Sequence, residues 1–370
     1  FDAYKVIRPK TEVRYRQFDE TAYERDLINA LAAGKGPDLF MVHNTWLPKH
    51  FDKMLPFADA QITPKQFQDL FPRVTEQDFA PDGAIFALPL YIDTLALLYN
   101  KDIFDRKGIA LPPNNWTEVQ DAIQKIREVD RGGRITLAGA ALGGAATVDS
   151  ASDILGLLML QTGAAMTSPD FSRATFASDG LTGLNFYTKF ADPRNALYTW
   201  SDDLGRSLDA FAGGNVGMIF DYADRLAIVQ DKNSFLRVGV VLMPQAEGAT
   251  NRVDYANYYG VAVAAQSANA AAAADTAHAL TADQGVNFAY LRATGHPPAL
   301  RATINGSLTL PTIGVFARQT LTARSWPQGD SAVVVRAFND MIADVVTRRS
   351  TPERAIKLAE DAVSQTMRRR

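Results

Sequence analysis

The chain has 370 residues, of which 47% are hydrophobic and 21% are charged, and its formal net charge is -3. This length exceeds one typical domain and predicts two, and the composition is that of a globular protein. The nearly balanced charge argues against nucleic-acid binding, which needs a basic face. The sequence contains no cysteine, which excludes disulfides, thiolate metal sites and cysteine nucleophiles.

The sequence also bears on membrane spans and export. It contains no run of about 18 uninterrupted apolar residues, so we predict no membrane span. We find no signal peptide in it. If the protein is exported, we expect this chain to be a mature or trimmed form.

The N-terminal part of the chain predicts alternating strands and helices. Residues 12–18 alternate in polarity with period two, which indicates a half-buried strand. Thr21 and Glu24 have the spacing of a capping box and open a helix that ends at Gly34. The apolar run from Leu39 to Val42 then indicates a short buried strand. This strand–helix–strand order favours a mainly parallel sheet.

The central stretch of the chain begins with a turn and contains two short apolar runs. Asp82-Gly83 is a turn signal, and Ala84 to Leu88 then reads as a short strand that Pro89 ends. Thr94 to Tyr99 is too short for an ordinary helix and is bounded by polar residues. It is therefore predicted to be a second, fully buried strand.

This stretch, DGAIFALPLYIDTLALLYNKDIF from Asp82 to Phe104, resembles a signature of the extracellular solute-binding proteins that serve ABC importers. The resemblance is greatest to family 1, the carbohydrate-binding, maltose-binding-like proteins. It implies that Tyr91 and Asp93 lie at the mouth of a ligand cleft. It also implies that the chain crosses between two lobes near Tyr99 and Asn100, which would act as hinge residues.

Other segments extend the resemblance to the C-terminus. Residues 31–38 read Leu-Ala-Ala-Gly-x-x-Pro-Asp, as in the family's N-terminal lobe. Residues 211–218 match the family's Phe-x-x-Gly-x-x-x-Met block, and the following Asp221-Tyr222 lies where the family places an aromatic residue at the cleft. The chain is predicted to end in a helix over 352–367. The inward-facing residues of this helix are predicted to be Ala355, Leu358, Ala359, Ala362, Val363 and Met367.

The resemblance implies an α/β protein with the two-lobe, type II periplasmic-binding-protein-like fold. Ligand would bind in a cleft between the lobes, and the chain would cross between them at three hinge segments. The first lobe is predicted to comprise residues 1–98 and 246–304, and the second residues 99–245 and 305–370. The family opens with a further strand before residues 12–18, so we expect part of the N-terminus to precede Phe1.

The sequence offers little for catalysis. No two of the four histidines have the spacing of a zinc-binding H-E-x-x-H helix, and neither G-x-S-x-G nor S-x-x-K occurs. The glycine-rich residues 139–144 lack the Lys-Ser/Thr of a phosphate-binding P-loop. Asp202-Asp203 is a carboxylate pair in sequence only, because adjacent side chains point in different directions. We therefore predict no enzyme activity, no metal site and no cofactor.

A sugar site needs aromatic faces for stacking and planar polar groups for the hydroxyls. Several aromatic residues stand at predicted strand ends or in loops, with amides and carboxylates beside them. Of Tyr258 and Tyr259, strand alternation sends one side chain inward and the other outward, so one at most contacts ligand. The candidate ligand-binding residues are Asn44, Trp46, Tyr91, Asp93, Trp200, Asp221, Tyr222, Asn257, Tyr258, Tyr259 and Trp326.

The resulting hypothesis is a monomeric extracytoplasmic protein that captures a sugar or oligosaccharide and delivers it to the permease of an ABC importer. It would be periplasmic or anchored to the membrane as a lipoprotein. One alternative is a binder of the same fold for a polyamine, an amino acid or a glycerophosphodiester. A second alternative is an enzyme or interaction protein on this scaffold, since fold does not fix function.

Overall fold

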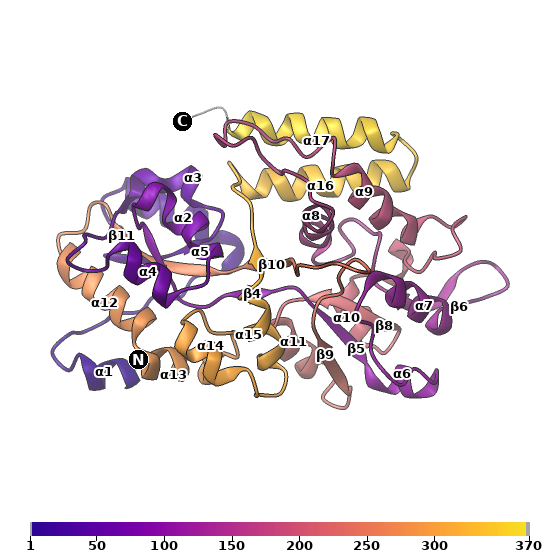
Figure 1. Ribbon diagram of the computed structural model, residues 1–370, viewed down its shortest axis with the longest axis horizontal. Coiled ribbons are helices and arrows are strands. Elements are labelled where there is room, and N and C mark those ends of the chain that lie inside the picture. The colour runs from indigo at the N-terminus through magenta and orange to yellow at the C-terminus, as the bar shows by residue number, and fades with distance from the viewer. Residues whose placement is uncertain (1, 368–370) are drawn as a thin grey trace. The chain divides into compact units, whose positions relative to one another are not determined.

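The computed structural model describes residues 2–367 and divides into two units, each formed by two separate stretches of the chain (Figure 1). Unit 1 comprises Phe1–Ile92 and Asn257–Thr309, and unit 2 comprises Asp93–Ala256 and Leu310–Arg370. The chain therefore passes between the units three times. The divisions predicted from the sequence come after residues 98, 245 and 304, whereas those of the structure come after residues 92, 256 and 309.

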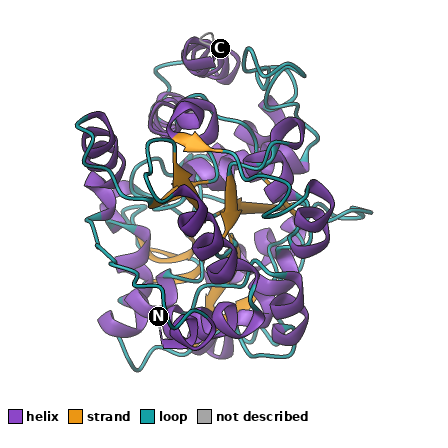
Figure 2. Ribbon diagram, turned by 90° about the vertical axis from the view of Figure 1, so that its left-hand side faces the viewer, coloured by secondary structure: helices purple, strands orange, loops and turns teal. Residues whose placement is uncertain are grey.

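Unit 1 is built on one small sheet in which β11 (Tyr259–Ala264) pairs antiparallel with β1 (Leu39–His43), β2 (Met54–Leu55) and β3 (Ala87–Pro89). Helices surround the short strands (Figure 2). The helices of unit 1 are α1 (Asp2–Ile7), α2 (Glu20–Ala32), α3 (Leu47–His50), α4 (Pro64–Leu70), α5 (Val74–Phe79), α12 (Ala270–Ala282), α13 (Gln284–Thr294) and α14 (Arg301–Ser307).

Two predictions for unit 1 are wrong. Residues 12–18 form no strand, and most of their side chains are exposed, because no neighbouring strand is present to bury one face of the alternating pattern. The sheet is not parallel either. The partner of β1 is β11, which lies more than 200 residues later in the chain and runs in the opposite direction, with His43 opposite Tyr259.

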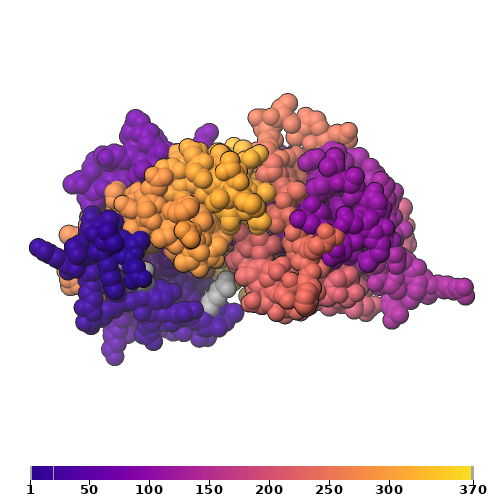
Figure 3. All heavy atoms as spheres, turned by 90° about the horizontal axis from the view of Figure 1, so that it is seen from below, coloured from indigo at the N-terminus to yellow at the C-terminus, as the bar shows by residue number. Residues whose placement is uncertain are grey.

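The N-terminal helix packs on the second stretch of unit 1. Tyr4 is buried, and its hydroxyl lies 3.1 Å from the hydroxyl of Thr276 on α12. The Arg8 guanidinium donates two hydrogen bonds of 2.7 and 2.8 Å to Asp275. Figure 3 shows the indigo N-terminal segment beside the orange segment of α12 and α13. The N-terminal helix thereby joins the first stretch of unit 1 to the second.

Unit 2 contains a five-stranded mixed sheet with the order β6 (Glu128–Val129), β7 (Ile135–Ala140), β8 (Val216–Asp221), β5 (Ala96–Asn100) and β9 (Val238–Val241). Strands β7 and β8 are parallel, and β5 is antiparallel to both β8 and β9. The helices of unit 2 are α6 (Lys101–Arg106), α7 (Trp116–Ile126), α8 (Ala151–Gln161), α9 (Leu181–Thr188), α10 (Ser207–Ala212), α11 (Arg225–Lys232), α15 (Ile313–Gln319), α16 (Ser331–Val346) and α17 (Pro352–Met367).

The protein also contains a small sheet of short strands and several 3-10 turns. A three-stranded sheet is formed by β12 (Ala323–Arg324), β10 (Asp254–Asn257) and β4 (Asp93–Thr94). Two of these strands adjoin points where the chain changes unit, since β4 begins at Asp93 and β10 ends at Asn257. Single 3-10 turns occur at Phe51–Lys53, Pro81–Gly83, Lys189–Ala191 and Asp202–Leu204.

Several local predictions are confirmed. Asp82 and Gly83 both have positive φ angles, of 56° and 84°, as a tight turn requires. The second apolar run forms the buried strand β5. The C-terminal helix spans Pro352–Met367 as predicted, but Leu358 is 54% exposed and Ile356 is buried in its place.

Candidate functional site

Unit 1 carries a continuous aromatic array at one edge of its sheet. Its members come from α2, α13 and the ends of β1, β3 and β11. We use the name aromatic array for Tyr23, His43, Trp46, Tyr91, Tyr259, Tyr290 and His296. The antiparallel pairing of β1 and β11 creates this edge, because it brings the last residue of β1 beside the first residue of β11.

The rings of the array are in mutual contact. The Trp46 ring stacks on Tyr23 at 5.9 Å between centroids with an interplanar angle of 26°, and meets Tyr259 edge-on, also at 5.9 Å. The Tyr91 ring stacks on His296 at 4.0 Å and lies 6.5 Å from Tyr259. These spacings are typical of favourable aromatic pairs. Trp46 is only 8% exposed, so the ring surface that the array offers lies on its partly buried members, such as Tyr91 and Tyr259, whose positions are fixed by their neighbours.

Polar groups lie within the array. The His43 Nε2 donates a hydrogen bond of 2.9 Å to Asn257 Oδ1, and its Nδ1 lies 2.8 Å from the hydroxyl of Thr45. The backbone N–H of Thr45 also points at Nδ1, which identifies that nitrogen as the acceptor. Burial lowers the pKa of His43 to about 4, so the ring is neutral at pH 7. The neutral imidazole therefore orients the Asn257 amide.

Four predicted residues are brought together here: Trp46, Tyr91, Asn257 and Tyr259. Two others, Asn44 and Tyr258, take structural positions instead. The Tyr258 hydroxyl donates a hydrogen bond of 2.7 Å to Asp78 Oδ2, and the Asn44 amide donates one of 3.1 Å to the same oxygen. Tyr258 is fully buried against Phe79, whereas Tyr259 is only partly buried. Strand alternation thus assigns Tyr259 to the array and Tyr258 to the core.

Unit 2 contains a group of carboxylates around Tyr222, which we call the carboxylate cluster: Asp93, Asp153, Asp221 and Asp224. Asp221 ends β8, and its Oδ1 accepts from the Ser150 hydroxyl at 2.9 Å and from the Tyr222 backbone N–H at 3.0 Å. The Tyr222 hydroxyl donates 2.6 Å to Asp153. Arg225 lies 3.6 Å from Asp224 and 3.9 Å from Asp221. Arg225 therefore lies beside two of the four carboxylates of the cluster.

The two most deeply buried carboxylates of this cluster have raised pKa values. Desolvation raises the pKa of Asp221 to about 7, and desolvation together with the charge of Asp224 raises the pKa of Asp93. Asp93 accepts from the backbone N–H groups of Ala223 at 3.0 Å and of Thr94 at 2.8 Å. Asp93 thereby ties the segment after β8 to β4 within unit 2.

The protonation of Asp221 gives a testable dependence of stability on pH. An unfolded aspartate titrates near pH 4 and folded Asp221 near pH 7, so folding binds a proton between these values. The free energy of unfolding should then fall as pH rises from about 4 to 7, by at most about 1.4 kcal/mol per pH unit from this group. Urea unfolding at several pH values should show a weaker fall in the Asp221→Asn variant than in the wild type. Parallel curves for the two proteins would contradict the assignment.

The structure corrects the predictions for Trp200 and Trp326. Trp200 is fully buried, its ring packs on Gly144, and its Nε1 donates 3.1 Å to the Thr147 hydroxyl. Trp326 is 3% exposed and stacks on Phe338 at 6.2 Å between centroids. Both rings already pack against neighbours of unit 2, so neither presents a free face to a ligand.

The predicted hinge residues also have other roles. The chain changes unit after Ile92, so Tyr99 and Asn100 lie inside unit 2. The Tyr99 ring covers Gly239 so closely that a Cβ there would lie 2.2 Å from it. The Asn100 Oδ1 accepts from the backbone N–H groups of Asp102 and Ile103 and caps α6.

Four members of the array were not among the predicted residues: Tyr23, His43, Tyr290 and His296. His43 has a local signal, because it lies between a predicted strand, which ends at Val42, and the predicted ligand residue Asn44. Tyr23 shows the inward periodicity of α2, which gives no sign that its hydroxyl accepts from Met41 N–H and donates to Met41 C=O. Tyr290 and His296 meet Tyr91 only through the fold.

Neither a cluster of metal-binding side chains nor a membrane-spanning helix occurs in the described part of the chain. Among residues 2–367, no group of three or more His, Asp or Glu side chains is arranged to hold a metal ion. No helix within these residues is both long enough and apolar enough to cross a membrane.

Residues 1–287 match the model of one protein family, described as bacterial extracellular solute-binding protein. The chain belongs to this family. One relative of this solute-binding protein is the maltotriose-binding protein of Pyrococcus abyssi, which is 30% identical over 125 residues. That alignment covers 34% of this chain and 26% of the relative, so the match extends over about a quarter of that protein.

Two further comparisons extend over most of the solute-binding protein. A probable ABC transporter-binding protein of Deinococcus radiodurans is 23% identical over 360 residues, which are 89% of this chain and 79% of that protein. The crystal structure of a cyclo/maltodextrin-binding protein complexed with maltotetraose matches with a TM-score of 0.79 at 18% identity. The match covers all of this chain and 93% of the other. The two-lobe α/β fold expected from the sequence is thereby confirmed.

Proposed function

We propose that this solute-binding protein captures a sugar or oligosaccharide and delivers it to the permease of an ABC importer. The observation that carries the proposal is the aromatic array of unit 1, in which Trp46, Tyr91 and Tyr259 are held by ring contacts beside the Asn257 amide. Flat apolar faces beside planar polar groups suit the C–H faces and hydroxyls of a sugar. The maltotriose- and maltodextrin-binding proteins that resemble the chain give independent support.

The ligand would contact residues of both units. From unit 1 the contacts are Trp46, Tyr91, Asn257 and Tyr259, and from unit 2 they are Asp93, Asp221 and Tyr222. A ligand favours a closed form only to the extent that it binds that form better than the open one. Residues of both units should therefore affect affinity when they are replaced one at a time.

A second candidate ligand class is a cationic solute such as a polyamine or an amino acid. The carboxylate cluster of unit 2 favours it, because four carboxyl groups gather around Tyr222 there. The raised pKa values of Asp93 and Asp221 weigh against it, since protonated carboxyls attract cations weakly. We therefore place the saccharide first.

The remaining parts of the proposal concern the protein as a whole. The protein acts as a monomer without nucleic acid, releases its ligand unchanged, and operates in the periplasm or as a lipoprotein on the cell surface. The match to a family of extracellular solute-binding proteins supports the location outside the cytoplasm.

A thermal-melt screen tests the ligand class. The panel would contain mono-, di- and oligosaccharides, with polyamines, amino acids and glycerophosphodiesters as comparators. A ligand that binds only the folded state at a hundred times its Kd adds about 2.7 kcal/mol to the free energy of unfolding. A rise in melting temperature with a saccharide is the expected result. A rise with a cationic solute alone would overturn the saccharide assignment and favour the carboxylate cluster as the site.

A further inference from the structure

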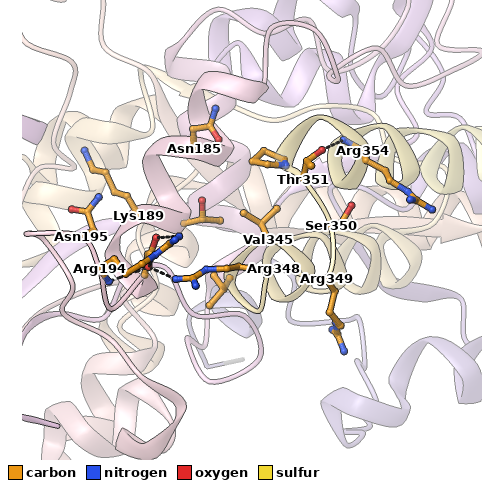
Figure 4. A pocket seen from close by; sticks show the side chains of 14 residues that line it. Asn185, Lys189, Arg194, Asn195, Val345, Arg348, Arg349, Ser350, Thr351 and Arg354 are labelled. Atoms are coloured by element: carbon orange, nitrogen blue, oxygen red, sulfur yellow. Dashed lines mark hydrogen bonds and ion pairs between the residues drawn. The ribbon is translucent and has the colours of Figure 1, made fainter. Parts of the chain in front are cut away.

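Unit 2 has a basic hollow whose lining includes none of the candidate ligand residues. It lies between the end of α9 with the segment after it and the loop that joins α16 to α17 (Figure 4). Its volume is about 570 Å³. The charged side chains that line it are Lys189, Asp192, Arg194, Arg348, Arg349 and Arg354. The Lys189 ammonium donates a hydrogen bond of 2.8 Å to Gln120 and lies over the Phe186 ring. The positive charge of the hollow therefore comes mainly from its four arginines, which outnumber Asp192, although the whole chain is negative.

One carboxylate neutralises only part of this charge. Asp192 accepts from Arg194 at 3.0 and 3.2 Å and from Arg348 at 3.0 Å. In Figure 4 these two arginines turn toward each other. Hydrogen bonds from Arg194 in particular lower the pKa of Asp192 to about 2, so it stays charged. Two guanidinium groups on one carboxylate leave a net positive charge at this end of the hollow.

The other cations lie around the rim. Arg354 is exposed and makes no ion pair within residues 2–367, and Arg349 pairs with Asp344 at 2.9 Å while 65% exposed. In Figure 4 both point away from the pair at Asp192. The neutral lining includes Val345, Val346 and Pro352. It also includes the polar residues Asn185, Thr188, Asn195, Ser350 and Thr351. Cations that spread around such a mixed lining suit an extended anionic chain better than one compact anion.

The backbone at Arg348 adds an independent observation. This residue follows the end of α16 with a φ angle of 59°, in the left-handed region that glycine normally occupies after a helix. Its N–H donates 3.0 Å to the Val345 carbonyl, as helix-end geometry requires. The chain therefore holds an arginine where glycine would be less strained, and that arginine supplies charge to the hollow.

We propose that this basic hollow is a docking site for an extended, carboxylate-rich segment of a partner protein. Charge complementarity determines the occupant: separated guanidinium groups match carboxylates spaced along a peptide, and the valine and proline side chains match the aliphatic parts of glutamate. The site is independent of the saccharide proposal, because all its residues lie in unit 2 and none belongs to the candidate ligand set.

The test uses the full chain and a fluorescein-labelled hexaglutamate peptide, with binding followed by fluorescence anisotropy. The test variant is Arg348→Gly with Arg354→Ser. Glycine fits the left-handed conformation at 348, so the variant should fold with an unchanged or higher melting temperature. The matched control is Arg134→Ser with Arg318→Ser, which also removes one paired and one unpaired exposed arginine from unit 2.

We expect the test variant to bind hexaglutamate about tenfold more weakly than the wild type, and the control variant within about twofold of it. Binding should weaken as salt rises, because the contacts are exposed. Equal losses in the two variants, or no binding by the wild type, would overturn the proposal. Displacement of the peptide by millimolar inorganic phosphate would identify a site for small anions instead. Binding to phosphatidylglycerol vesicles without binding to the peptide would identify a membrane surface.

Discussion

Replacement of Tyr259 by alanine is expected to weaken saccharide binding by about tenfold to a hundredfold. The Tyr259 ring lies in the middle of the aromatic array, where it contacts His43 at 5.0 Å, Trp46 at 5.9 Å and Tyr91 at 6.5 Å. Its loss would remove one stacking face and also loosen the rings on either side. Central aromatic residues of a binding site commonly contribute 2 kcal/mol or more, and about 1.4 kcal/mol corresponds to a factor of ten.

Isothermal titration calorimetry with the saccharide found in the melt screen would measure this effect. Tyr259→Phe keeps the ring and should retain most of the affinity. Tyr15→Ala is the matched control, because Tyr15 is a 69% exposed tyrosine of the same unit outside the array. Affinity that is unchanged in Tyr259→Ala would remove the array from the binding site and leave the carboxylate cluster as the candidate.

The second large effect is on stability. Trp200→Ala should lower the free energy of unfolding by about 3–5 kcal/mol, as is usual when a large buried aromatic residue is truncated. The ring is fully buried against Gly144, where an added Cβ would lie 2.5 Å from it, and the indole N–H would lose its bond to Thr147. For a protein of this size the melting temperature should fall by about 5 °C.

Urea unfolding and thermal melts would measure this loss, and calorimetry would measure ligand affinity at a temperature where the variant is folded. Because Trp200 lies in the core of unit 2, its replacement should leave affinity within a few-fold of the wild type. A variant of normal stability that binds ligand weakly would show instead that Trp200 is a ligand residue. That result would also require a different conformation of the segment around Gly144.

The capping predictions illustrate why local patterns identify helices better than their ends. The Thr21 and Glu24 spacing predicts a capping box, yet the cap of α2 is Asp19, which accepts from the Thr21 N–H. Glu24 instead pairs with His50 at 2.7 Å and with Lys49 at 2.8 Å. Several residues near a helix start can accept the first free N–H groups. Tertiary partners then decide which of them does so.

The positions of aromatic side chains are even harder to predict from local sequence than helix caps are. Tyr91, Trp46 and Trp200 all stand in predicted loops or at strand ends, and composition alone gives no way to rank them. In the structure the first two join the array, whereas the third packs on glycine in a core. A loop tryptophan becomes buried when a distant glycine provides space for its ring, and that glycine is 56 residues away in the chain.

The sequence by itself determined the family, the two-lobe α/β architecture, the Asp82-Gly83 turn and the full length of α17, whereas the strand predicted over 84–88 lies at Ala87–Pro89. These features depend on short-range periodicity, turn residues and a motif that lies in one continuous stretch. Only the tertiary structure decided that β11 pairs with β1, that Tyr259 rather than Tyr258 faces the array, and that Tyr290 and His296 stack near Tyr91. Such contacts join residues about 200 positions apart. They form because the antiparallel sheet and the packing of α13 close long loops, whose outcome no local pattern encodes.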